Sequence, residues 1–128
     1  MDKGIKADWL TALRSGEYGQ GKGFLKNDRS AGRTQYCCLG VLCELAVKAG
    51  IIEPSEKDDD DELYRFDGLS SYLPPKVATW ADIHYQGKLY REGDTGSISD
   101  RRVSVDLADL NDYKLDFAGI ADVIEKEF

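Results

Sequence analysis

Glycines alternate with polar residues at positions 19–23, which read Gly-Gln-Gly-Lys-Gly. Closely spaced glycines allow backbone N–H groups to converge on an anion, and Lys22 would add a positive charge to such a nest. This arrangement would suit a phosphate. The spacing matches neither the P-loop pattern nor the dinucleotide-binding pattern GxGxxG, and no strand is predicted before it. A flexible turn between two elements is therefore the competing interpretation.

Cysteine is the next residue type that could carry chemistry. Cys37 and Cys38 stand at the start of a predicted helix, where the helix dipole lowers a thiol pKa and favours a nucleophile. A cysteine enzyme also needs a base, and His84 is the one histidine of the sequence. Because two of the three cysteines are adjacent and no CxxC pair exists, a zinc site is not expected. We predict reduced, buried thiols, no catalytic residue, no metal and no cofactor.

Carboxylates and amides gather near the carboxyl end of the sequence. Asp109, Asp112 and Asp116 could divide acid and base roles, but capping and solvation of short helices explain them more simply. Asn111 and Asp112 together could bind a ribose or the edge of a base. The arginines at 29, 33, 101 and 102 are either anion clamps or dispersed surface charges. With Tyr18 as a stacking ring, the predicted ligand site consists of Tyr18, Gln20, Gly21, Lys22, Arg33, Asn111 and Asp112.

Two helices are predicted on either side of the glycine-rich segment. Residues 8–15 have apolar side chains at helical spacing, and Gly16 is a natural stop. Residues 38–49 are apolar on nearly every side, which is typical of a helix buried at the centre of a domain. Gly50 followed by Ile51 predicts a Schellman motif at the end of this second helix.

The remaining segments complete the predicted fold. Residues 53–62, EPSEKDDDDE, are expected to form an exposed acidic loop, because consecutive aspartates repel one another, and they lack the pattern of a calcium-binding loop. Beyond this loop we expect a helix over 74–80, a hairpin over 83–92 that turns near Gln86, a strand over 98–105, a helix over 106–112 and a last helix capped by Asp116. The predicted fold class is α+β, a helix-dominated single domain over residues 1–128 with a buried central helix and a small antiparallel sheet.

Composition limits the classes of protein to be considered. The chain has 128 residues, 17 basic and 24 acidic side chains, and a formal net charge of -7. An acidic chain is a poor general nucleic-acid binder, because phosphate neutralisation needs clustered Lys and Arg. No apolar run approaches about 18 residues and the amino end lacks a signal-peptide pattern, so we expect a cytosolic protein without membrane contacts. Residues 53–67 and 104–128 carry most of the negative charge; they could face a basic partner or only solvent.

Five blocks of sequence resemble a widespread family of small proteins encoded by bacteriophages and prophages. The blocks are WxxALRSGEYxQG at 9–21, YCCLGVLCEL at 36–45, LPPxVxxWA at 73–81, LADLND at 107–112 and FxxIADxIE at 117–125. The family usually has glycine where Asp82 stands, and a Ser or Thr with an acidic residue three positions later where this chain has Asp116 and Gly119. Residues 82–104 have no counterpart in this resemblance.

The resemblance implies an accessory protein that acts in the host cytoplasm. Phage proteins of this size often counter host immunity. Some sequester a nucleotide-derived signal without cleaving it, and others bind a defence protein directly. Our first hypothesis is a non-enzymatic binder of such a signal, with the oligomeric state left open and a homo-oligomer as one alternative. The second is an inhibitor whose acidic faces meet the basic nucleic-acid-binding surface of a host defence complex, as anti-CRISPR proteins do. The third hypothesis is a small hydrolase. It ranks last because no nucleophile and base are paired in the sequence.

Overall fold

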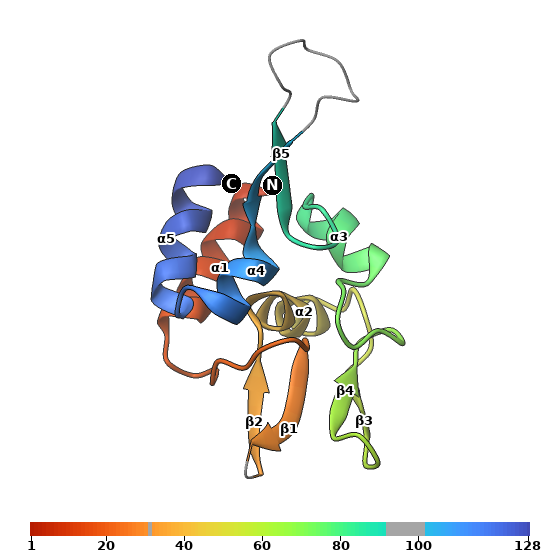
Figure 1. The fold of residues 1–128 in the computed structure, drawn as a ribbon. Coiled ribbons are helices and arrows are strands. Elements are labelled where there is room, and N and C mark those ends of the chain that lie inside the picture. The colour runs from red at the N-terminus through yellow and green to blue at the C-terminus, as the bar shows by residue number, and fades with distance from the viewer. Residues whose placement is uncertain (31, 92–101) are drawn as a thin grey trace.

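A computed structural model describes residues 1–30, 32–91 and 102–128 (Figure 1). The helices of these residues are α1 (Lys3–Arg14), α2 (Cys38–Lys48), α3 (Pro75–Ala81), α4 (Leu107–Tyr113) and α5 (Phe117–Glu127). The strands are β1 (Lys26–Ser30), β2 (Arg33–Tyr36), β3 (Glu56–Asp58), β4 (Leu63–Arg65), β5 (Lys88–Arg91) and β6 (Arg102–Asp106). The helix-dominated α+β fold with small antiparallel sheets is therefore confirmed. Within the described ranges, no helix is long and apolar enough to cross a membrane.

Helix α2 lies at the centre of the molecule, between the four-stranded sheet and the pair of α1 and α5 (Figure 1). Most of its side chains are buried, as the all-round apolar pattern predicted. A Cβ at Gly40 would lie 1.7 Å from the carbonyl oxygen of Leu25, so only glycine allows this close packing of two backbones. Gly50 has a φ of 75°, and the N–H of Ile51 donates to the carbonyl of Ala46 at 2.9 Å, which confirms the predicted Schellman motif.

Helices α1 and α5 pack side by side and cover α2 on one side (Figure 1). Trp9 is fully buried, and its indole N–H donates to the carbonyl oxygen of Cys38 at 3.0 Å. At the surface, Arg14 joins the two helices through ion pairs to Asp122 at 2.9 Å and Glu125 at 2.8 Å. These contacts hold the amino end of α2 in place, next to the residues predicted to bind a ligand.

The four-stranded sheet is antiparallel in the order β2-β1-β4-β3 (Figure 1). It consists of two hairpins that meet at one pair of residues, Asn27 and Leu63. Strand β3 lies inside the segment 53–62 that the sequence predicted as a loop, although its side chains are exposed. Lys57 interrupts the acidic run and the backbone pairs with β4, so the neighbouring carboxylates can remain in solvent. Backbone pairing thus extends the sheet into this segment. Its charges predict that the side chains are exposed, but they do not exclude a strand.

Strands β5 and β6 form a separate two-stranded antiparallel sheet (Figure 1). The predicted hairpin over 83–92 is wrong, because the partner of β5 is β6. Gly87, with a φ of 68°, donates to the carbonyl of His84, and this turn leads from α3 into β5. Residues 98–101 of the predicted strand lie outside the described residues. The last three helices are confirmed, and the Asp116 carboxylate caps α5 by accepting from the N–H of Gly119 at 2.9 Å.

Candidate functional site

The glycine loop, residues 16–23, lies against the end of β2. The N–H of Tyr36 donates to the carbonyl of Gly19 at 2.8 Å, and the N–H of Gly21 donates to the carbonyl of Tyr36 at 2.7 Å. A Cβ at Gly21 would lie 2.8 Å from the Cβ of Gln35. Position 21 therefore needs glycine because two stretches of backbone approach closely there. The sequence suggested that this glycine forms part of an anion-binding nest, and the structure gives a second, structural reason for it.

Asn111 fastens the glycine loop to the amino end of α2. It is 1% exposed, and its Oδ1 accepts from the backbone N–H of Cys38 at 3.2 Å and from Nε2 of Gln20 at 3.0 Å. Its Nδ2 donates to the carbonyl of Gly21 at 2.9 Å and to Oδ1 of Asp112 at 3.1 Å. Both atoms of the Asn111 amide are thus bonded twice within the protein, which fills its capacity.

The neighbouring predicted residues belong to the same junction. Nε2 of Gln20 also donates to the carbonyl of Leu115 at 2.9 Å. Oδ1 of Asp112 accepts from the backbone N–H of Gly23 at 2.9 Å. The structure therefore brings Gln20, Gly21, Asn111 and Asp112 together, as the sequence suggested. They bond directly to one another.

A hollow of about 370 Å³ opens beside the same glycine loop, toward the hairpin of β1 and β2. Lys22 lies at this hollow, and the described residues that line it are Gln20, Gly21, Lys22, Phe24, Asn27, Arg29, Ser30 and Gln35. Two predicted site residues, Arg33 and Tyr18, belong neither to this hollow nor to the junction around Asn111. Arg33 is exposed on β2. The Tyr18 ring packs edge-on against Tyr36 with centroids 5.1 Å apart, and its hydroxyl accepts from Nζ of Lys48 at 3.2 Å.

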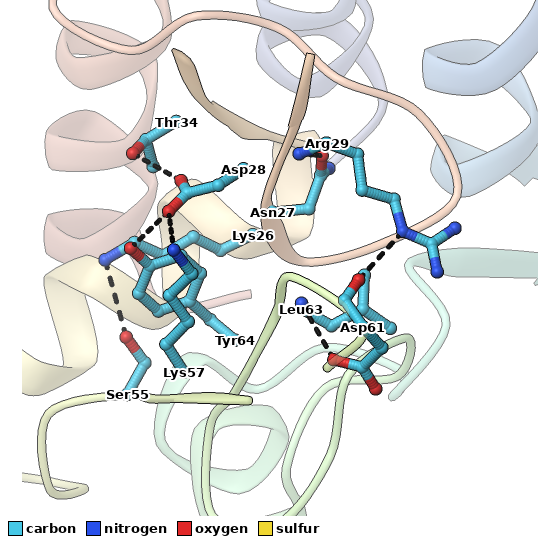
Figure 2. A network of polar contacts seen from close by, with 10 residues as sticks. All are labelled: Lys26, Asn27, Asp28, Arg29, Thr34, Ser55, Lys57, Asp61, Leu63 and Tyr64. Atoms are coloured by element: carbon cyan, nitrogen blue, oxygen red, sulfur yellow. Dashed lines mark hydrogen bonds and ion pairs between the residues drawn. The ribbon is translucent and has the colours of Figure 1, made fainter. Parts of the chain in front are cut away.

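Asn27 forms part of the wall of this hollow and is only 4% exposed. Its Oδ1 accepts from the backbone N–H of Arg29 at 3.0 Å, which fixes the orientation of the amide (Figure 2). A Cβ on Gly21 would be 3.4 Å from Nδ2 of Asn27, so this nitrogen lies beside the glycine loop. Among the described residues, Nδ2 has no hydrogen-bond acceptor, and no side-chain nitrogen or oxygen there is both fully enclosed and unbonded. Nδ2 therefore faces the hollow.

Arg29 spans the two hairpins of the sheet. Its Nε donates to the backbone carbonyl of Asp61 at 3.0 Å (Figure 2). Its guanidinium carbon lies 5.0 Å from the centroid of the Phe24 ring, a cation–π distance. One side of the guanidinium is therefore held by protein contacts. In the described part of the chain, its two terminal nitrogens have no ion-pair or hydrogen-bond partner, and the same is true of Lys22.

Asp28, the residue of β1 that follows Asn27, lies in a second polar cluster. Asp28 accepts from the Thr34 hydroxyl at 2.6 Å, from Nζ of Lys57 at 2.9 Å and from the Tyr64 hydroxyl at 2.9 Å (Figure 2). These hydrogen bonds, from Thr34 first and then Lys57, lower the pKa of Asp28 to about 2. Since the two hairpins share so little backbone pairing, this cluster holds β3 and β4 against β1. Each of its polar groups has a structural partner.

Two further hollows have a different chemical character. One of about 770 Å³ lies along the acidic hairpin and is lined by Glu53, Pro54, Glu56, Lys57, Asp58, Asp59, Asp60, Arg65, Asp67 and Gly68. The other, of about 400 Å³, lies beside α3 and includes Asp82 and His84. Both contain carboxylates, whereas none of the described residues that line the hollow beside the glycine loop is acidic.

The thiols are enclosed in the core. Cys37, Cys38 and Cys43 are all buried, and none forms a disulfide. Burial raises the pKa of Cys37 to about 11 and the pKa values of Cys38 and Cys43 well above their usual range, because the thiolate loses its hydration. No group of three His, Cys, Asp or Glu side chains suitable for a metal ion occurs within residues 1–30, 32–91 and 102–128. The cysteines therefore act as small apolar residues.

Comparison with known proteins gives one match. No curated protein and no solved structure is similar to this chain. A family model described as Domain of unknown function (DUF8296) matches residues 1–128, and so covers the glycine loop, the sheet and α4 together. The chain is therefore a member of the DUF8296 family over all of these residues.

Proposed function

We propose that this protein binds a small nucleotide-derived ligand in the hollow beside the glycine loop and holds it without chemical change. In the phage setting that the sequence resemblance suggests, the ligand would be an immune signal and the protein its sequestering agent in the host cytoplasm. The supporting observation is electrostatic. In a chain of net charge -7, the described residues that line this hollow supply two cations, three amides, a hydroxyl and an aromatic ring, and no carboxylate. Such a lining favours an anion.

The other lining groups suit the remainder of a nucleotide. The volume of about 370 Å³ lies within the range of small-molecule sites. Bases stack on aromatic rings, and the Phe24 ring is in the lining with the Arg29 guanidinium over one face. Gln35 provides an amide group that can bond to a base edge, whereas Nε2 of Gln20 is already bonded to Asn111 and Leu115. Each part of a nucleotide thus has a complementary group.

Binding without catalysis follows from the same lining. Acid–base chemistry needs a titratable side chain near neutral pH, and nucleophilic chemistry needs an activated nucleophile. Among the residues that the structure describes, the lining contains no carboxylate, histidine or cysteine. The thiols, which could have served as nucleophiles, are buried in the core with raised pKa values. We therefore expect the ligand to be recovered intact.

Thermal unfolding in the presence of nucleotides tests this proposal. The panel contains nucleoside mono-, di- and triphosphates and cyclic mono- and dinucleotides. A ligand at one hundred times its Kd stabilises the native state by about 2.7 kcal/mol, which for a chain of this length raises Tm by roughly 10 °C. Mass spectrometry of the recovered ligand should show no product, and light scattering gives the oligomeric state. A panel without any Tm shift, or a ligand that is cleaved, would contradict the proposal.

The acidic hairpin supports a second candidate, an inhibitor that binds a basic surface of a host defence complex. Six carboxylates line the hollow of about 770 Å³ there, against one lysine and one arginine. Attraction between such a face and a basic partner would be salt-sensitive. Capture of a nucleic-acid-binding host protein that is lost when Asp58, Asp59 and Asp60 are all changed to Asn would favour this candidate. Capture that survives these changes would count against it.

A further inference from the structure

Asn27 presents a donor that the fold leaves without an acceptor. No enclosed side-chain nitrogen or oxygen of the described residues lacks a bond, so this N–H is open to solvent, where water or a ligand can accept from it. The amide is held in this orientation because its Oδ1 is bonded to the backbone N–H of Arg29. Asn27 therefore lines the hollow with its Nδ2 beside Gly21. This points to a ligand group that accepts hydrogen bonds.

Two cations flank this donor. Arg29 is held by the carbonyl of Asp61 and by the Phe24 ring, so its terminal nitrogens are positioned before any ligand arrives. A guanidinium held in this way binds phosphoryl oxygens in pairs with little loss of conformational freedom. Lys22 is exposed at the rim of the same hollow and adds a charge on a long, adaptable side chain. The same hollow is thus lined by an amide, a guanidinium and an ammonium group.

We infer that Asn27, Arg29 and Lys22 together recognise one phosphoryl group of the ligand, with Asn27 as the specificity-determining residue. A phosphoryl group has three acceptor oxygens, which matches one neutral amide donor, one guanidinium and one ammonium. This inference rests on the proposed nucleotide-binding function and names the part of the ligand that the hollow reads. It differs from the site predicted from sequence, in which Arg33 was the arginine and Asn111 the amide.

The test compares matched variants by isothermal titration calorimetry. Asn27→Asp keeps an oxygen that can accept from the Arg29 N–H but replaces the donor by a negative charge. Arg29→Gln removes the guanidinium, and Arg33→Gln removes an exposed arginine of the adjacent strand that lies outside the hollow. The probes are the four common ribonucleoside 5′-monophosphates, the corresponding nucleosides and inorganic phosphate. Urea unfolding of each variant verifies that it is folded.

We expect at least one monophosphate to bind the wild type, and its nucleoside to bind at least tenfold more weakly. Asn27→Asp and Arg29→Gln should each lower the affinity for the monophosphate by at least about tenfold, the effect of losing one hydrogen bond to a charged group. Arg33→Gln should stay within about twofold of the wild type. This pattern would support both the inference and the proposed function.

Other outcomes distinguish the inferred phosphoryl site from the proposed nucleotide-binding function. A monophosphate that binds wild type, Asn27→Asp and Arg29→Gln equally would overturn the inference while leaving nucleotide binding intact. Inorganic phosphate that binds through Asn27 and Arg29, without any gain from a nucleoside, would support the phosphoryl site and overturn the nucleotide function. Absence of binding by every probe to the folded wild type would overturn both. An Arg33→Gln loss as large as that of Arg29→Gln would show that general surface charge, and not this hollow, attracts the anion.

Discussion

Replacing Asn111 by leucine would break the junction between the glycine loop and α2. The two side chains have the same number and branching of heavy atoms, so the change removes the hydrogen bonds while keeping the shape of the side chain. Gln20 would keep its bond to the carbonyl of Leu115. The N–H of Cys38 and the carbonyl of Gly21 would lose the bonds of 3.2 and 2.9 Å that they make to the amide. Both of these backbone groups are in buried residues.

The cost follows from these two groups. A buried polar group left without a partner costs about 1–3 kcal/mol, so Asn111→Leu should lower the free energy of unfolding by about 2–6 kcal/mol. Domains of this kind have roughly 5–15 kcal/mol in total, so the loss would be a large share of the stability. With a melting entropy of about 2.1 cal/mol/K per residue, each kcal/mol lowers Tm by about 4 °C in a chain of 128 residues. We therefore expect Tm to fall by roughly 8–24 °C.

Equilibrium unfolding in urea measures this change directly. The midpoint should fall while the slope stays the same, because the amount of surface exposed on unfolding is unchanged. Tyr113→Leu is the matched control, since that side chain on the same helix is 78% exposed and should change stability by less than about 0.5 kcal/mol. An Asn111→Leu variant within about 1 kcal/mol of the wild type would refute our view that this amide holds the loop and the helix together.

Three further predictions concern the core and the sheet. Gly40→Ala should destabilise the protein by at least about 1–3 kcal/mol in the same urea assay, because the added Cβ would collide with the carbonyl of Leu25, and a wild-type midpoint would contradict this packing. The lowered pKa of Asp28, about 2, means that its ionised form stabilises the fold above pH 4 and that this contribution is lost as the pH falls toward 2. Urea titrations at both pH values should show a smaller loss in Asp28→Asn than in the wild type, and equal losses would argue against the Asp28 cluster. A thiol reagent at pH 8 should label the native protein slowly and all three cysteines at once in denaturant, whereas fast labelling of the native protein would contradict the burial of Cys37, Cys38 and Cys43.

Elements with a strong local signal could be predicted from the sequence. Residues 38–49 are apolar on all sides, and the observed α2 is the buried central helix. Gly50 and Asp116 end and begin helices as their types suggest. Helix α1 begins earlier than expected, at Lys3, because Asp2 caps it by accepting from the N–H of Ile5. Its first turn is mostly polar, so apolar spacing gave no sign of it.

The sheet could not be predicted because its strands lack the usual pattern. Strands β1 and β2, KNDRS and RTQY, contain almost no apolar residues and no clear alternation of apolar and polar positions. Their stability comes from pairing with each other and from side-chain contacts such as those of Asp28. The hairpin also contains a shift in register between Asn27 and Ser30, so the face on which each side chain lies cannot be counted from the sequence.

The residues of the candidate site also divide into some that could be predicted from the sequence and some that could not. Gln20, Gly21 and Lys22 were identified because closely spaced glycines beside a lysine are visible in sequence. Asn27 and Phe24 were not identified, since their roles depend on the hairpin. Arg29 was considered as an anion clamp, but only the structure distinguishes it from the other arginines by placing it at the hollow. A short polar strand next to a glycine-rich loop is the one signal that could have indicated these residues.

The described residues contain two buried polar side chains, and the difference between them separates structure from function. Asn111 was predicted to read a ligand, yet its amide makes four hydrogen bonds within the protein and has no capacity left. Asn27 was not predicted as a site residue, yet its Nδ2 has no acceptor among the described residues and it lines a hollow together with Arg29 and Lys22. The Nδ2 of Asn27 is not enclosed, so it reaches the space of the hollow, whereas the amide of Asn111 is used up within the fold. The glycine loop is therefore bonded to the fold through Asn111 on one side and borders the hollow on the other, where a ligand could bond to Asn27.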